Sequence, residues 1–166
     1  MPDLDTQVLI CGGGPVGLCL TIELALRGTP CAIVNESETV ATHPQGNTMN
    51  ARTMEHYRRF GVAPKVRETG LPLAHVTDSV YLTRLNGQEI VRFKMPSAAE
   101  KIAPGSPERE VGPEPLHRVS QMLVEQILKD KADELPAADV RFGWRLLGFT
   151  QLADHVEAEL EVARSG

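Results

Sequence analysis

The chain has 166 residues, about the size of one average domain, and its 42% hydrophobic and 23% charged residues are ordinary for a globular protein. The formal net charge is −5, and no Lys/Arg cluster stands out beyond Arg58-Arg59, which argues against a nucleic-acid partner. No apolar run approaches the roughly 18 residues of a membrane span, and the acidic N-terminus is unlike a signal peptide. We therefore expect a cytoplasmic protein without a membrane segment.

The chain opens with the pattern of a strand, a helix and a second strand. Residues 6–11 form a short apolar run that ends at glycines, which is typical of a buried parallel strand. The spacing then predicts a helix over 15–27, ended by Gly28, and a second buried strand over 31–35. Two parallel strands connected in this way imply a right-handed crossover. The helix face that we expect to be apolar comprises Val16, Leu20, Leu24 and Ala25.

The next segment predicts two helices. Residues 37–49 are polar and irregular. Asn50 is a favourable cap for a helix over 51–60, because its side chain can accept a hydrogen bond from a backbone amide of the first turn. A shorter helix fits residues 62–69.

A hairpin and a long loop follow. Residues 76–85 and 88–94 are extended and partly alternating, and Asn86-Gly87 between them is typical of a two-residue hairpin turn. Residues 96–116 carry five prolines and several charges, so we expect a long loop there.

The last third predicts one helix and three strands. Ser120 is expected to cap a helix over 121–134. The sequence then predicts a strand over 140–142 and two more over 145–151 and 155–162. The chain is therefore predicted to end in antiparallel strands. The residues of this helix that should face a core are Leu123, Ile127 and Leu128.

Other reactive side chains form no recognisable site. The cysteines lie in apolar runs without a C-x-x-C pair, so we interpret them as buried free thiols, which suits a reducing compartment. The histidines show no metal-ligand spacing, and we expect no metal. No serine lies in a G-x-S-x-G setting. The residues concerned are Cys11, Cys19, Cys31, His43, His56, His75, His117 and His155.

The glycines after the first strand predict a nucleotide site. The sequence GGGPVG satisfies G-x-G-x-x-G. Gly12 permits the tight turn, Gly14 lets backbone approach a pyrophosphate, and Gly17 lets the helix pack closely on the strand. With Pro15 and Val16 they form the predicted phosphate loop, where the phosphates would meet free N–H groups at the helix N-terminus.

Glu36 completes this fingerprint. It ends the second strand, 19 residues after Gly17, and its carboxylate would accept hydrogen bonds from ribose hydroxyls. The same charge would repel a 2′-phosphate, which argues against NADP at this site. FAD and NAD present the same ADP, so these residues alone do not separate the two cofactors.

Three segments in order carry a family resemblance. They are residues 8–18 (VLICGGGPVGL), 43–44 (HP) with 50–55 (NARTME), and 118–125 (RVSQMLVE). Together they resemble the flavin-dependent aromatic hydroxylases, the single-component FAD monooxygenases of the phenol hydroxylase and p-hydroxybenzoate hydroxylase type.

This resemblance implies FAD as cofactor and NAD(P)H as co-substrate. In such enzymes NAD(P)H reduces FAD, and oxygen then supplies one atom to a small aromatic or phenolic substrate; the flavin carries the chemistry. By resemblance, Glu36 would hold the adenosine ribose, and Gln121 and Arg118 would lie near the ribityl chain and pyrophosphate. Arg52, in the first turn after the loop, is either a cofactor contact or a solvated helix residue. No catalytic residue can be assigned.

The expected fold is α/β: a Rossmann-like FAD-binding βαβ unit with an inserted β-hairpin and a C-terminal antiparallel meander. We expect 1–75 and 117–166 to form the nucleotide-binding portion and 76–116 to begin a substrate domain. The family commonly has an Arg where this chain has Gln45, which predicts weaker phosphate binding. The family's later Asp-Gly and Gly-Asp segments are absent, so the fold is incomplete relative to the family.

Several alternatives stay open. A nicotinamide-dependent dehydrogenase opens with the same fingerprint, but the predicted hairpin interrupts its regular βα repeats. A non-catalytic nucleotide-binding remnant or a split subunit is the other alternative. We expect the 166-residue chain alone to be inactive. A homo-oligomer or a complementing downstream polypeptide would be its macromolecular partner. The sequence does not name the substrate or distinguish NADH from NADPH.

Overall fold

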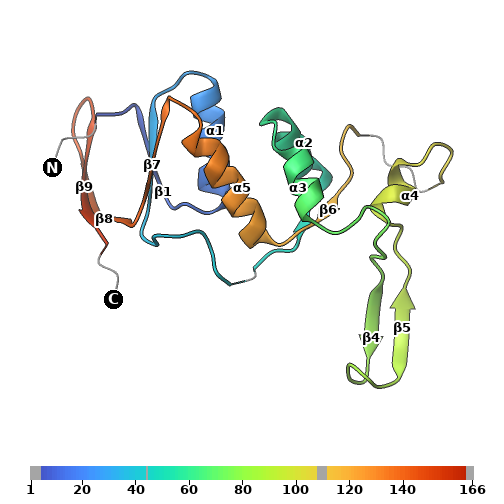
Figure 1. Cartoon of the computed structure of the whole chain (residues 1–166). Helices are drawn as coiled ribbons and strands as arrows, with labels where there is room; N and C mark the ends of the chain where they lie inside the picture. Colours follow the sequence, from blue (N-terminus) through green and yellow to red (C-terminus); the bar gives the residue numbers. More distant parts are fainter. Residues whose placement is uncertain (1–4, 44, 108–111, 164–166) are drawn as a thin grey trace. The chain divides into compact units, whose positions relative to one another are not determined.

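The computed structural model describes residues 5–43, 45–107 and 112–163 (Figure 1). The chain divides into two compact units, of which the first comprises Met1–Asn47 with Ser120–Gly166 and the second comprises Thr48–Val119. Within the described ranges, none of the helices has the length and apolar character needed to cross a bilayer. Pro44 of the family segment and residues 108–111 of the expected loop lie outside the described residues.

The first unit is built on a parallel sheet with strand order β1-β2-β7. Ile10 of β1 pairs with Ile33 of β2, and Ile33 pairs with Val140 of β7. Helices α1 and α5 lie side by side against this sheet (Figure 1). The predicted βαβ unit is confirmed. The elements are β1 (Val8–Cys11), α1 (Pro15–Leu26), β2 (Cys31–Asn35), α5 (Gln121–Asp133) and β7 (Ala138–Phe142).

The buried faces of the two helices differ from the predicted ones. In α1, Leu18 and Ile22 are fully buried and Ala25 is buried as predicted, but Val16 is 83% exposed, so the predicted face was wrong in part. The reason is that α1 is apolar on nearly every side, and periodicity alone could not choose the side that meets the sheet. In α5, Ile127 and Leu128 lie in the core as predicted, whereas Leu123 is exposed and Val124 is buried in its place.

The chain ends in antiparallel strands, as predicted. Strand β8 (Trp144–Gln151) pairs with β9 (Val156–Val162) in a two-stranded sheet. Trp144 lies opposite Val162, and Gln151 lies opposite Val156. The preceding strand β7 does not join this hairpin sheet; it pairs in parallel with β2 and so completes the three-stranded sheet of the first unit.

The second unit contains the two predicted helices, α2 (Ala51–Arg59) and α3 (Ala63–Thr69). The Asn50 side chain accepts a hydrogen bond from Thr53 N at 2.8 Å, which confirms the predicted cap. A short ribbon, in which β3 (Thr48–Met49) pairs antiparallel with β6 (His117–Arg118), was not predicted. Strands of two residues are too short to show an alternating pattern.

The predicted hairpin is present as β4 (Ser79–Leu82) and β5 (Glu89–Phe93), but its turn differs from the expected one. Thr83 N donates to Gln88 O at 3.0 Å, so residues 84–87 form a four-residue connection. Gln88 N also donates to Thr83 Oγ1 at 3.0 Å. Gly87 has no positive φ, which the expected Asn-Gly turn would require. The Thr83 side chain therefore closes a wider loop.

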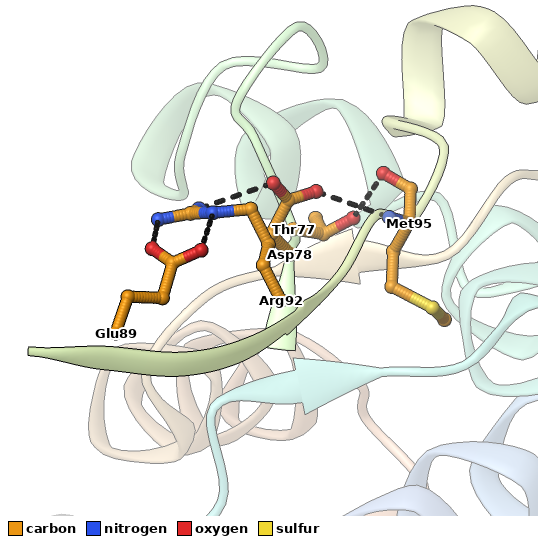
Figure 2. Close-up of polar contacts among 5 residues, drawn as sticks. All are labelled: Thr77, Asp78, Glu89, Arg92 and Met95. Atoms are coloured by element: carbon orange, nitrogen blue, oxygen red, sulfur yellow. Dashed lines mark hydrogen bonds and ion pairs between the residues drawn. The ribbon is translucent and has the colours of Figure 1, made fainter. Parts of the chain in front are cut away.

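Ionic and polar contacts fix the base of this hairpin (Figure 2). The Arg92 guanidinium bonds to Glu89 at 2.7 Å and to Asp78 at 3.2 Å. Asp78 also accepts from Met95 N at 3.0 Å, and Thr77 Oγ1 donates to the Met95 carbonyl. The hydrogen bond from Met95 N, followed by the Arg92 side chain, lowers the pKa of Asp78. Asp78, the residue before β4, thus connects Arg92 of β5 with Met95 in the segment that follows the hairpin.

The expected loop over 96–116 contains a helix, so this expectation was wrong in part. Helix α4 spans Ala98–Ile102 and begins with a capping box. Glu100 N donates to Ser97 Oγ at 3.3 Å, and Ser97 N donates to the Glu100 carboxylate at 2.7 Å. The spacing Ser-x-x-Glu is the recognised signature of this motif and could have identified the helix from sequence.

His117 is a buried titratable group in the second unit. Its side chain is 2% exposed, and Nε2 has no hydrogen-bond partner among the described residues. Burial lowers the pKa of His117, and the nearby positive charge of Arg67 lowers it further, while a hydrogen bond to the Val66 backbone acts in the opposite direction. The folded unit therefore favours the neutral imidazole.

We predict that acidification below the ordinary histidine pKa of 6.5 destabilises the second unit through His117. Between the two pKa values the unfolded chain binds more protons than the folded chain, so lowering the pH favours unfolding. Denaturant unfolding followed by circular dichroism, at about pH 7.5 and about pH 5.5, should show a smaller acid-induced loss in His117→Gln than in the wild type. The exposed His75→Gln is the matched control, and an equal loss in all three proteins would contradict the prediction.

Candidate nucleotide-binding site

The glycine loop has the geometry that a close turn requires. Gly12 adopts a φ of +111°, which side chains other than glycine rarely tolerate, and its N–H donates to Val34 O at 2.8 Å. A Cβ on Gly17 would overlap the carbonyl oxygen of Gly12, so only glycine lets α1 approach the end of β1 this closely. A Cβ on Gly14 would meet no atom within 4 Å. Gly17 therefore serves packing, whereas Gly14 borders open space.

The N-terminus of α1 offers unpaired donors to an anion. Gly14 occupies the N-cap position, no side chain caps the helix, and Pro15 begins its first turn. The first-turn N–H groups of a helix have no intrahelical partner, and the helix dipole places partial positive charge there. Gly13 N is anchored separately, since it donates to Asn35 Oδ1 at 3.0 Å. Sequence reasoning missed this role of Asn35, the last residue of β2.

Glu36 follows β2 directly, next to the residue that anchors the glycine loop. Its side chain is exposed and forms an ion pair with Nη2 of Arg145, from β8. Arg145 also approaches Glu161 of β9 at 3.7 Å. This ion pair was not predicted, because no local pattern connects Glu36 with a residue so distant in sequence. The Glu36 carboxylate therefore has a cationic neighbour, Arg145, before any ligand binds.

Gln121 begins α5 and holds the segment that follows Glu36. Its backbone N–H donates to Gly46 O at 2.8 Å, and its side-chain oxygen accepts from Gly46 N at 3.2 Å. Its side-chain amide donates to Gln45 at 3.2 Å and to Glu125 at 2.7 Å. The structure thus brings Gln121 together with the loop after β2, and it reveals Glu125 as a polar residue that sequence reasoning missed.

The two predicted arginines belong to the second unit. Arg52 forms an exposed ion pair with Glu55 at 2.8 Å. Arg118 lies in β6, and its Nε is buried without a hydrogen-bond partner in the described part of the chain. Ser120 precedes α5 at the N-cap position, but its side chain makes no capping hydrogen bond and its Oγ is buried without a partner among the described residues, so the expected capping bond was wrong. A cofactor contact by either arginine stays a prediction.

The cysteines show no sign of reactive chemistry. Burial raises the pKa of Cys19 to about 11, and burial also raises the pKa of Cys31, whose thiol donates to Thr21 O at 3.7 Å. Cys11 is exposed, so the expectation that all three thiols are buried was wrong. In the described ranges no group of three or more His, Cys, Asp or Glu is arranged to hold a metal ion.

Comparison with known proteins identifies the family. The profile of the FAD binding domain family matches residues 5–166. The chain belongs to this family. The predicted α/β fold, the predicted cofactor FAD and the resemblance to flavin-dependent aromatic hydroxylases are thereby confirmed at the level of the family.

Its relatives include monooxygenases and hydroxylases. The chain is 33% identical over 155 residues to the FAD-dependent monooxygenase apdD of Emericella nidulans, covering 92% of this chain and 25% of apdD. It is 31% identical over 162 residues to a putative polyketide hydroxylase of Streptomyces halstedii, covering 96% of this chain and 28% of that protein. The chain thus spans about a quarter of these relatives' length.

Solved structures agree with this assignment. The chain resembles RebC soaked with chromopyrrolic acid, with bound 7-carboxy-K252c, at a TM-score of 0.83 and 35% identity, covering 97% of this chain and 29% of RebC. It resembles the flavin-dependent monooxygenase PieE in complex with FAD and substrate at a TM-score of 0.85 and 28% identity, covering 98% of this chain and 28% of PieE.

The surroundings of the predicted site residues are compatible with the ADP half of FAD. The open space beside Gly14 leaves room for a pyrophosphate, and the uncapped N-terminus of α1 supplies N–H donors. The exposed Glu36 carboxylate lies at the carboxyl end of β2, the edge at which open α/β sheets bind ligands.

We predict that two glycine substitutions separate ligand binding from folding. Gly14→Val should leave the stability near that of the wild type but abolish FAD binding, because the new side chain occupies the open space. Gly17→Ala should cost about 1–3 kcal/mol of stability, because its methyl group overlaps the Gly12 carbonyl. Thermal unfolding and FAD titration of both variants test this prediction. A Gly14→Val protein with wild-type FAD affinity would contradict the close-approach argument.

Proposed function

We propose that this chain forms the FAD-binding portion of a flavin-dependent monooxygenase that hydroxylates small aromatic or phenolic substrates with NAD(P)H and oxygen. The observation that carries the proposal is the open, uncapped glycine loop beside an exposed acid at the end of β2. The names of the relatives support the reaction class, since one is a 2,4-dichlorophenol 6-monooxygenase and another a 6-methylpretetramide 4-monooxygenase. Bound FAD would supply the electron transfer and the activation of oxygen.

The chain's own residues would bind and orient the cofactor. The loop from Gly12 to Gly17 would hold the pyrophosphate through first-turn N–H groups, and Glu36 would accept hydrogen bonds from the adenosine ribose. Gln121 and Arg118 would lie near the ribityl chain and the pyrophosphate, and Arg52 is a further candidate contact. All of these residues serve binding, and none of them is proposed to act on the substrate.

We further propose that two parts of the chain serve different functions. Residues 1–75 and 117–166 would form the nucleotide-binding portion, and 76–116 would begin the substrate domain. The β4–β5 hairpin supports this division, because a regular series of βα repeats has no place for it and every residue of β5 is exposed. We also propose a cytoplasmic location, which fits a flavoenzyme with small soluble substrates.

Replacing Glu36 with Ala should weaken FAD binding by about 1.5–3 kcal/mol, the usual range for hydrogen bonds to a charged group. Stability should change little, because an exposed ion pair such as Glu36–Arg145 contributes little to folding. Isothermal calorimetry with FAD measures the affinity. Glu38→Ala, which removes an exposed acid two residues away, is the matched control. Equal affinities of the two variants would show that Glu36 is only a solvated acid.

Titration with FAD, FMN and NAD, followed by flavin fluorescence or calorimetry, tests the cofactor assignment. FAD should bind more tightly than FMN, because FMN lacks the ADP group that this site would hold. The 166-residue chain with FAD and NAD(P)H should not hydroxylate phenols, because none of the proposed contacts reaches the isoalloxazine ring or the substrate. Tighter binding of FMN would overturn the cofactor assignment, and oxygen uptake coupled to hydroxylated product would show that these residues suffice for turnover.

A further inference from the structure

Glu125 is a carboxylate buried in the first unit. It lies on α5, one turn after Gln121, and is 3% exposed. Its two oxygens have separate partners: Oε2 accepts from Ala41 N at 2.9 Å, and Oε1 accepts from Gln121 Nε2 at 2.7 Å. Both partners are uncharged N–H donors. Burying a carboxylate is costly unless its hydrogen bonds are satisfied, so a neutral side chain would be the easier choice if packing were its only task.

The second partner shows what this carboxylate orients. Because Gln121 Nε2 faces Glu125, the side-chain oxygen of Gln121 faces Gly46 N, from which it accepts at 3.2 Å. The backbone N–H of Gln121 donates to Gly46 O at 2.8 Å. Glu125 therefore holds the loop after β2 directly at Ala41 and, through the amide of Gln121, at Gly46.

The topology places this arrangement at the ligand edge of the sheet. The loop leaves the carboxyl end of β2 just after Glu36. Helix α5 leads through a short connection into β7, which is parallel to β2, so the first residue of α5 lies toward the same edge. The glycine loop leaves β1 there as well. Ligands of open α/β sheets bind at this edge.

We propose that Glu125 is a positioning residue for FAD: it fixes the amide of Gln121 and the backbone at Ala41 and Gly46 in the arrangement that receives the cofactor. The inference rests on the proposed function, since Gln121 is assigned there to the ribityl region. Glu125 itself acts through Gln121 and the loop. Its role is to set their geometry before the cofactor binds, which reduces the ordering that binding requires.

Two substitutions isolate this role. Glu125→Gln keeps the shape of the side chain but directs one NH₂ group toward an N–H donor, either Ala41 N or Gln121 Nε2, so one hydrogen bond is lost. The reciprocal exchange, Gln121→Glu with Glu125→Gln, restores the pattern. Gln at 125 can then accept from Ala41 N and donate to Glu at 121, which can accept from Gly46 N. Glu134→Gln, an exposed position at the other end of α5, is the matched control for the lost charge.

The experiment compares three measurements on the wild type and these variants. The rate of hydrogen exchange at the Ala41 and Gly46 amides reports how firmly the loop is held when no cofactor is bound. Calorimetry with FAD reports affinity, and denaturant unfolding followed by the fluorescence of Trp144, the single tryptophan, reports the stability of the first unit. In Glu125→Gln we expect both amides to exchange faster and FAD to bind about tenfold more weakly, as for one lost charge-assisted hydrogen bond. The reciprocal exchange should restore the protection of both amides, and Glu134→Gln should change neither the exchange nor the FAD affinity.

Three outcomes would overturn the inference. Unchanged exchange of Ala41 and Gly46 in Glu125→Gln would show that the carboxylate does not hold the loop. Faster exchange with unchanged FAD affinity would show that the loop does not matter for the cofactor. Exchange that stays fast in the reciprocal variant would show that the hydrogen-bond pattern between positions 121 and 125 does not hold the loop. If the wild type binds no FAD, the proposed function fails by itself, and the exchange data still decide whether Glu125 positions the loop.

Discussion

The approach of α1 to the end of β1 governs the candidate site. It depends on the missing side chain at Gly17, where a Cβ would overlap the Gly12 carbonyl. Because α1 starts this close to the strand, its uncapped first turn lies at the carboxyl edge of the sheet, next to the end of β2. Asn35 secures the same loop from the neighbouring strand through its bond to Gly13 N at 3.0 Å. These two constraints set the position of the glycine loop and of the first turn of α1.

Around this loop, polar contacts between distant segments complete the first unit. Glu125 contacts Ala41 across 84 residues of sequence, and Arg145 contacts Glu36 across 109. Charged side chains also make contacts at the base of the hairpin in the second unit, where Arg92 bonds to Glu89 and Asp78 (Figure 2). In both units the apolar core fixes the elements, while a few charged side chains fix the loops that leave them.

The sequence predicted those features that have a local cause. The glycine loop, the Asn50 cap and the strand over 31–35 each follow from neighbouring residues, and each was found. The buried side of α1 could not be predicted, because a helix that is apolar all round has no preferred face until it meets the sheet. The hairpin turn differed because the Thr83 side chain offered Gln88 an additional acceptor. Glu125 and Arg145 were missed because their partners lie far away in sequence.

The ion pair between Glu36 and Arg145 gives the carboxylate that is proposed to receive the ribose a competing partner within the chain. A ligand that uses this carboxylate must share it with a guanidinium or displace it, so its net affinity is the difference between two contacts. Exposed ion pairs weaken as ionic strength rises. The contact proposed between Glu36 and a ribose would therefore depend on the salt concentration, even though the ribose carries no charge.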